Sequence, residues 1–547
     1  MRIPCTLMGQ TRCHAAMTRI VNLWLLCLLL IALPFAAMAQ DDADDGQALL
    51  EALDVRSFQD KAEAIEAIIQ SEDERANDWL QALLDGDLQR HKDDGRFVII
   101  TDNVGREWPA RDALTGEDVG EISRRELSRI DINNALRSQL RSALSMVELY
   151  TGERDERLDA AEGLIGDVDD ELADSLESRL DDEADADVRN RLNQALAVYR
   201  LEQGEMDAVE TLSGSLNSDV RIALSRAAEG EGAVADAARA ALVDIEQKLK
   251  VNRGLETLYF GLSMGSVLVL AAIGLAITFG VMGVINMAHG ELIMLGAYST
   301  WMMQQLLPGH PGLAVLLSIP VGFLVSALVG VIIERSVIQH LKGRPLETLL
   351  ATFGVSLILQ QLVRTVVSPL NRTVTTPEWM SGSVAINDAL SLTLNRLYIM
   401  AFAVLVFVGL ILIMRRTRLG LEVRAVTQNR AMARSMGIRA TRVDILTFAL
   451  GSGVAGLAGV ALAQLTNVGP NLGQSYIIDS FMVVVFGGVG NLWGTLVAGL
   501  SLGVINQILE PWAGAVLAKI LVLVFIILFI QKRPRGLFPQ KGRAAEG

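Results

Sequence analysis

The sequence predicts an all-α protein in which a signal peptide and a soluble, mainly helical domain precede a polytopic membrane domain of packed helices. Three observations carry this prediction. The chain begins with a basic and then apolar segment typical of secretion signals. Residues 40–253 hold 52 acidic and 25 basic residues, a net charge of −27, whereas the remainder holds 11 and 23, a net charge of +12. From about residue 255 onward, apolar stretches long enough for membrane helices follow one another.

The first 39 residues carry the features of a signal peptide. Scattered arginines precede the apolar run 20–37, and Ala37-Met38-Ala39 forms a small-residue cleavage pattern. We therefore expect cleavage after residue 39, and an uncleaved signal anchor is the alternative. All three cysteines lie before residue 28, so the cleaved chain would contain no thiol.

Residues 40–253 are expected to form an acidic, mainly helical domain. Apolar residues recur there at helical spacing, as in Ala64, Ile65, Ala67 and Ile68. The segment 96–120 interrupts this pattern, with a candidate strand at Phe97 to Thr101 followed by turn residues. The segments 156–164, 185–199 and 233–245 each resemble the second helix of a HEAT-type repeat, at an irregular period. We identify no catalytic constellation and no metal site in this part of the chain.

Residues 254–532 are expected to form the membrane domain, and residues 533–547 a basic cytoplasmic tail. The domain contains about nine hydrophobic segments, at 255–280, 284–306, 312–333, 346–367, 397–414, 444–466, 475–490, 492–509 and 514–531.

The distribution of basic residues predicts the orientation of these segments. Lysine and arginine gather in the loops 335–344 and 415–442 and at 532–543, which we place in the cytoplasm. The loop 368–396 has two arginines only and is expected outside. Nine crossings that start outside end inside, which agrees with an exported acidic domain and a cytoplasmic C-terminus.

The segment 279–298 concentrates polar groups within apolar sequence. Asn286, His289 and Glu291 lie within six residues of one another, and glycines flank them. Each ionisable group costs at least about 2.5 kcal/mol at the bilayer centre, unless it contacts protein or lines a cavity. We therefore predict a broken helix beside a pathway through the membrane. A polar cluster that only holds helices together is the alternative.

The basic loop 415–442 is too long and too regular for a simple turn. Apolar residues such as Val423 and Met436 mix with arginines in a pattern that predicts a short amphipathic helix ending at Gly437. Such a helix suits docking onto a partner at the membrane face. Anchoring on anionic lipid explains its composition equally well.

Two further motifs have structural explanations. Gly261-Leu262-Ser263-Met264-Gly265 matches a nucleophile elbow and Gly451–Gly456 matches G-x-G-x-x-G, but both lie in apolar helices, so close helix packing is expected. We expect Asp479 to cap a helix, and Lys519 to pair with Glu510 or reach the interface. The chain contains no G-x-x-x-x-G-K-[ST] segment, so any ATPase is a separate polypeptide.

Several long motifs together resemble the branched-chain amino-acid family of ABC transporter permeases, most closely its urea-transport branch. The resemblance covers about residues 250–540. The matching stretches are 261–298, 343–361, 423–438 (VRAVTQNRAMARSMGI), 447–459, 480–495 (SFMVVVFGGVGNLWGT) and 533–538 (RPRGLF). Ordinary members of the family lack a large exported N-terminal domain. The N-terminal domain expected here resembles the one that precedes the urea-type permease.

The resemblance implies a multi-pass subunit of a bacterial inner-membrane importer. It implies a second permease subunit, cytoplasmic ATPase subunits that carry ATP and Mg²⁺, and a periplasmic solute-binding protein. No cofactor is expected in this chain, and no nucleic-acid partner. The solute would be small and neutral, with urea first. Asn286, His289 and Glu291 would shape the translocation pathway. The ATPase-coupling helix would include Arg424, Gln428, Asn429, Arg430, Arg434 and Gly437.

Three alternatives stay open. The same kind of importer could carry branched-chain amino acids or short amides. An intramembrane hydrolase would use Ser263 or His289. A membrane sensor would bind its ligand through residues 40–253.

Overall fold

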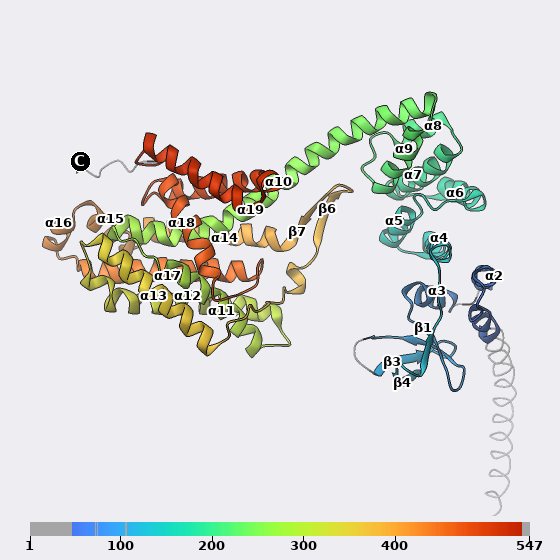
Figure 1. Cartoon of the computed structure of the whole chain (residues 1–547), viewed down its shortest axis with the longest axis horizontal. Helices are drawn as coiled ribbons and strands as arrows, with labels where there is room; N and C mark the ends of the chain where they lie inside the picture. Colours follow the sequence, from blue (N-terminus) through green and yellow to red (C-terminus); the bar gives the residue numbers. More distant parts are fainter. Residues whose placement is uncertain (1–45, 72, 74, 104–106, 539–547) are drawn as a thin grey trace, which may run out of the picture. The chain divides into compact units, whose positions relative to one another are not determined.

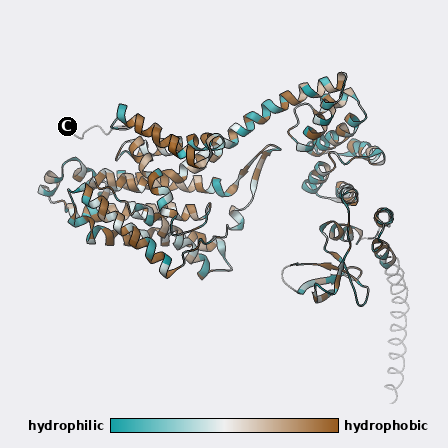
Figure 2. Ribbon diagram, in the orientation of Figure 1, coloured by the Kyte–Doolittle hydropathy of each residue, from teal (hydrophilic) through white to brown (hydrophobic). Residues whose placement is uncertain are grey.

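The computed structural model describes residues 46–538 apart from residues 72, 74 and 104–106. The predicted signal peptide at 1–39 and the tail beyond residue 538 lie outside the described residues. The chain divides into two compact units, one ending at Ile245 and the other beginning at Glu246 (Figure 1). Hydrophobic residues dominate the helices of the second unit, whereas hydrophilic and hydrophobic residues alternate in the first (Figure 2).

The first unit contains a five-stranded antiparallel sheet with strand order β4-β3-β2-β1-β5. The strands are β1 (Leu88–His91), β2 (Phe97–Ile100), β3 (Glu107–Asp112), β4 (Asp118–Ser123) and β5 (Leu127–Arg129). The predicted strand at 97–101 is confirmed as β2. The other four strands were not predicted, because they are short or polar. All residues of β4 but Ile122 and Ser123 are exposed, so this strand shows no apolar alternation.

Strand β2 lies at the centre of the sheet and is buried on both faces. Phe97 and Ile99 join the core formed with α2 (Phe58–Gln70) and α3 (Ala76–Asp85). Val98 and Ile100 pack on the opposite face against Trp108 and its neighbours. Successive strand residues point to opposite faces, so one four-residue strand contributes to two cores.

The remaining helices of the first unit are α4 (Asn134–Thr151), α5 (Arg154–Gly163), α6 (Asp170–Asp182), α7 (Ala186–Glu202), α8 (Met206–Leu212) and α9 (Ser218–Glu229), followed by the start of α10 (Ala233–Met282). Among them, α5, α6, α8 and α9 pack against a central one, α7, and α4 packs against α5. The three repeat-like segments fall on α5, α7 and the start of α10. Their HEAT-type character stays a prediction.

A buried carboxylate ties α5, α6 and α7 together. The Glu183 side chain is 2% exposed and accepts bonds from Arg157 (3.2 Å) and Arg179 (2.6 Å). It also accepts the backbone N–H of Asp185 at 2.9 Å. Burial opposes ionisation, but this backbone bond and the two guanidinium groups outweigh it and hold the pKa of Glu183 below its ordinary value.

The described part of the second unit, residues 246–538, contains helices and one hairpin. After α10 come α11 (His289–Leu306), α12 (Pro311–Ser336), α13 (Pro345–Val366), the hairpin β6 (Ser383–Asn387) and β7 (Leu390–Thr393), and α14 (Leu394–Arg416). Then follow α15 (Arg418–Gln428), α16 (Arg430–Ser435), α17 (Ala440–Ala463), α18 (Leu472–Gly487) and α19 (Leu492–Lys532). Single-turn 3₁₀ helices lie at Ile338–His340 and Glu378–Met380.

Helix α17 is buried along most of its length and packs by backbone contact against α11 and α12. A Cβ on Gly459 would overlap the carbonyl oxygen of Ile293, and one on Gly296 would overlap that of Gly456. Small residues permit this approach, as expected for membrane helix pairs. The packing interpretation of the 451–456 motif is therefore confirmed.

The first motif, 261–265, has the same explanation. A Cβ on Gly261 would lie 2.7 Å from the Cα of Val504, and one on Gly265 would lie 2.7 Å from the Cα of Leu500. Ser263 is fully buried, and its hydroxyl has no hydrogen-bond partner among the described residues. A serine nucleophile needs an adjacent base, which the hydrolase alternative lacks at this residue.

Among residues 46–538, six helices are long and apolar enough to cross a membrane: α10, α12, α13, α14, α17 and α19. Helix α18 is apolar but shorter. The backbone of α19 is non-helical at Gly514, where φ is 75°, so it consists of two helices that correspond to the last two predicted segments. The number of crossings stays a prediction.

The cap expected at Asp479 and the Glu510 partner expected for Lys519 are wrong, whereas the reach of Lys519 to the interface stays a prediction. Asp479 lies inside α18, where it caps nothing, and Lys519 donates to its carboxylate at 3.1 Å. The two residues are 40 positions apart, so sequence proximity favoured Glu510 as the partner of Lys519.

Candidate functional site

The polar cluster of 279–298 lies at a break between two helices. Helix α10 ends at Met282, and α11 begins at His289. Gly283 adopts a φ of 67°, which the absence of a Cβ permits, and the backbone from 283 to 286 is irregular. Asn286, His289 and Glu291 are each about 1% exposed. The predicted break is therefore present, with all three side chains buried inside the unit.

These three side chains turn toward different neighbours. The Asn286 side-chain oxygen accepts the backbone N–H of Ala288 at 3.0 Å, within the break itself. His289 Nε2 lies 2.9 Å from the carbonyl oxygen of Ala271 on α10. A carbonyl only accepts, so Nε2 carries the proton in this arrangement and Nδ1 is a free acceptor.

Glu291 is bound by α13. Its Oε1 accepts Ser356 Oγ at 2.9 Å and Gln360 Nε2 at 2.7 Å. Met287 N–H donates to Thr352 Oγ1 at 3.1 Å, so the same helix also holds the break. The positions 352, 356 and 360 lie four residues apart and form one face of α13. Ser356 and Thr352 were not predicted as site residues, although polar residues at this spacing in an apolar helix were the available signal.

Several polar atoms of this cluster lack partners among the described residues. They are Asn286 Nδ2, His289 Nδ1 and Glu291 Oε2. Leaving such atoms buried costs roughly 1–3 kcal/mol each, more for a charged group. A carboxylate oxygen and a ring nitrogen accept hydrogen bonds, whereas the amide nitrogen donates them. The cluster thus retains hydrogen-bonding capacity of both kinds.

The basic loop 415–442 forms two helices where one was predicted. Asn429 separates α15 from α16 because its backbone is extended (φ −150°) and its side chain accepts the N–H of Met432, capping α16. The predicted end is confirmed: α16 stops just before Gly437, which has a φ of 87°. Val423, Val426 and Ala433 form the buried side, together with Ala440 and Val443.

The six residues expected on a coupling helix separate into three groups. Arg424, Gln428 and Arg434 are exposed, although Arg424 also donates to the Met414 carbonyl. Asn429 and Gly437 shape the backbone at the ends of α16. Arg430 turns inward and pairs with Asp444 on α17. The exposed side of α16 also presents Met432 (61% exposed) and Met436 (77% exposed).

A buried group of charges connects this loop to the membrane helices. Glu334 at the end of α12 and Asp444 in α17 are fully buried. Lys342 Nζ lies 2.9 Å from a carboxylate oxygen of each, and Arg430 completes the group through Asp444. We call Glu334, Lys342, Arg430 and Asp444 the ionic latch. The ionic latch was not predicted from the sequence. The only signal was an acidic residue at the end of each of two apolar segments, which does not identify its partners.

Comparisons with known proteins agree with this architecture. A family described as "Branched-chain amino acid transport system / permease component" matches residues 257–530. The chain is 29% identical over 300 residues to the high-affinity branched-chain amino acid transport system permease protein LivH of Escherichia coli K12, covering 52% of this chain and 94% of LivH. It is 30% identical over 296 residues to the corresponding BraD of Pseudomonas aeruginosa, covering 52% and 95%.

A more distant similarity reaches a sugar permease. The ribose import permease protein RbsC of Escherichia coli K12 is 30% identical over 203 residues, covering 36% of this chain and 60% of RbsC. No solved structure matches. The family match covers half of the chain, and BraD is covered almost completely. The chain therefore belongs to the family of branched-chain amino acid transport system permease components.

Proposed function

We propose that this chain is the permease subunit of an ATP-driven importer in the bacterial inner membrane and that its solute is urea. Membership of the family makes it a subunit of an ABC transporter, with nucleotide binding on separate subunits. Residues 40–253 would then be periplasmic and residues 533–547 cytoplasmic, as the loop charges predict. A second permease subunit and a periplasmic solute-binding protein would complete the complex.

The cytoplasmic elements α15 and α16 support the proposed ATPase contact. Arg434 lies between the exposed methionines Met432 and Met436, which together give a cationic and apolar surface. Flexible methionines adapt to a partner surface. Arg430 connects the same short helix to α17 through the ionic latch. A displacement of α16 by the ATPase would therefore reach the membrane helices directly.

The polar cluster between α11 and α13 supports a small neutral solute. Urea presents two amino groups that donate and one carbonyl that accepts. Glu291 Oε2 and His289 Nδ1 are available acceptors, and Asn286 Nδ2 is an available donor. The observation that carries the urea proposal is this buried set of unsatisfied atoms of both kinds. Transport requires that the pathway open alternately, with ATP shifting the population between two states.

Branched-chain amino acids are the second candidate. LivH and BraD are named for their transport. Arg364 lies one helical turn beyond Gln360 on α13 and donates to Asn471 at 2.7 Å. A leucine zwitterion needs a cation for its carboxylate and an acceptor for its ammonium group, and Arg364 with Glu291 would supply both.

Uptake of radiolabelled urea and leucine by nitrogen-limited cells, with and without this gene, tests the proposal. Loss of urea uptake alone supports urea. Loss of leucine uptake alone keeps the importer and replaces the solute, and Arg364→Gln should then abolish leucine uptake. If neither uptake changes in cells that express the complete complex, the solute proposal is wrong.

A further inference from the structure

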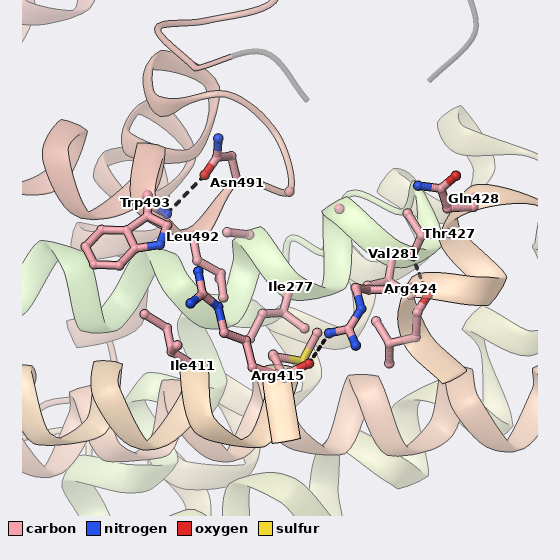
Figure 3. Close-up of a pocket in the computed structure, with 15 residues that line it drawn as sticks. Ile277, Val281, Ile411, Arg415, Arg424, Thr427, Gln428, Asn491, Leu492 and Trp493 are labelled. Carbon is pink, nitrogen blue, oxygen red and sulfur yellow. Dashed lines mark hydrogen bonds between the residues drawn. The ribbon is translucent and has the colours of Figure 1, made fainter. Parts of the chain in front are cut away.

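A cavity of about 480 Å³ opens where four segments of the second unit meet. Its walls come from the end of α10, the end of α14, helix α15 and the turn between α18 and α19. None of the fifteen lining residues drawn in Figure 3 is acidic, and two are arginines, Arg415 and Arg424. The volume lies in the range of small-molecule sites.

The two arginines differ in what holds them. Arg424 donates to the carbonyl of Met414, which fixes its side chain against the end of α14. The Arg415 side chain has no hydrogen bond or ion pair within the described part of the chain. Figure 3 shows its guanidinium group on the Trp493 side of the cavity and that of Arg424 on the Thr427 side. Two cations facing one cavity without a carboxylate repel each other, so an anion between them is favoured.

The rest of the lining is mostly apolar. Ile277, Val281, Ile411 and Leu492 line the cavity, with Thr427, Gln428 and Asn491 as neutral polar groups. A small, fully hydrated anion gains nothing from the apolar wall. An anion attached to hydrocarbon uses both parts of the lining, the arginines and the aliphatic side chains.

The aromatic and basic residues around the cavity are typical of a membrane interface. Trp493 is 52% exposed and packs edge-on against Phe407, with ring centroids 5.3 Å apart. Exposed tryptophans gather at the headgroup level of membrane proteins. Arg416 and Arg418 follow Arg415 in the sequence, at the end of α14 and the start of α15. Asn491 Nδ2 donates to the Phe538 carbonyl at 3.1 Å, which brings the basic C-terminal segment close.

We propose that this cavity binds the phosphate headgroup of an anionic phospholipid of the cytoplasmic leaflet, with Arg415 and Arg424 as the anion-binding groups. The inference rests on the proposed orientation, which puts this face in the cytoplasm. Basic pockets between membrane helices on that side suit anionic headgroups. The bound lipid would join α10 and α14 to α15, and so support the helix that precedes α16.

The test measures lipid retention by the full-length chain in nanodiscs of phosphatidylcholine with a minority of phosphatidylglycerol. Native mass spectrometry after mild release counts retained phosphatidylglycerol. Arg415→Gln should reduce retention about fivefold, the effect of one arginine near an anionic surface. Arg416→Gln is the matched control, since this neighbour is exposed and does not line the cavity.

A second arm distinguishes a lipid from a soluble anion. Inorganic phosphate and glycerophosphoglycerol are added before release, and neither should displace the lipid. Equal retention by the Arg415 and Arg416 variants, equal retention of phosphatidylcholine, or displacement by inorganic phosphate would each overturn the proposal. Arg415→Gln carries the test alone, because Arg424→Gln also removes a contact that holds the end of α14.

The outcome is independent of the solute. If uptake of urea and leucine is unaffected by the gene while phosphatidylglycerol is retained through Arg415, the proposed function fails alone. If uptake depends on the gene while lipid retention ignores Arg415, the lipid inference fails alone.

Discussion

The ionic latch predicts opposite roles for Arg430 and Arg434, which lie four residues apart in α16. Arg430 contacts the buried Asp444, whereas Arg434 is exposed and its side chain has no hydrogen bond or ion pair within the described part of the chain. Arg430→Gln should therefore lower the stability of the protein. Arg434→Gln should leave stability unchanged and weaken the coupling of ATP hydrolysis to transport.

The magnitude follows from the geometry of the latch. Charges 2.9 Å apart, as for Lys342 and Asp444, attract by roughly 6 kcal/mol at an effective dielectric of about 20. Desolvation offsets much of this, and breaking a fully buried pair costs about 3–5 kcal/mol. The Arg430 side chain is 34% exposed, and Asp444 keeps Lys342, so the expected loss for Arg430→Gln is smaller, about 1–2 kcal/mol.

Equilibrium unfolding of the purified full chain in one detergent, followed by tryptophan fluorescence, measures this loss. Arg434→Gln should stay within about 0.5 kcal/mol of the parent protein, as a surface substitution does. A double-mutant cycle of Arg430→Gln and Asp444→Asn should give a coupling of about 1 kcal/mol or more. Equal stabilities for the Arg430 and Arg434 variants, or a coupling of zero, would refute the reasoning.

Three further predictions concern packing, pH and the polar cluster. Gly296→Ala should destabilise the membrane unit by about 1–3 kcal/mol in the same unfolding assay, because its Cβ overlaps a carbonyl of α17, whereas Gly409→Ala has open space and should be neutral or stabilising. Glu183 has a folded-state pKa below its ordinary value of 4.5, so its contribution is complete above that value and is lost as the pH falls through the folded pKa. Acid titration of stability should therefore be shallower for Glu183→Gln than for the parent protein, and parallel curves would contradict the assignment. Glu291→Gln should reduce solute uptake about tenfold or more at normal expression, equivalent to about 1.4 kcal/mol, and undiminished uptake would remove Glu291 from the pathway.

The sequence predicted the features of this fold that are local in the chain. Glycines and polar groups at 280–291 predicted the break between α10 and α11. Glycine gives the backbone the freedom to leave the helix, and polar side chains are costly to expose to lipid. Gly437 predicted the end of α16, because glycine readily adopts the positive φ that ends a helix. The apolar stretches and the small-residue motifs likewise predicted where helices form and how closely they approach.

Pairings between distant segments could not be predicted. Lys342 and Asp444 are 102 residues apart, and nothing in either neighbourhood specifies the other. Strand β4 was missed because its first four residues are exposed, so its pairing with β3 leaves no apolar alternation in the sequence. Asn429 was read as part of a helix surface, since its capping role depends on the extended backbone that only the structure shows.

The backbone contacts of α17 decide which parts of the membrane unit can bend. Side chains that lie between two helices can change rotamer and let one helix slide over the other. At Gly296, Gly456 and Gly459 the backbones are in direct contact, with no layer of side chains between the helices. Helices α11, α12 and α17 would therefore travel as one rigid piece during transport. Hinges are then confined to residues with irregular backbone, above all the break before His289 and the interruption of α19 at Gly514. Substitutions that rigidify the backbone at these two positions would therefore block the transport cycle, whereas further rigidity in α11, α12 and α17 would not.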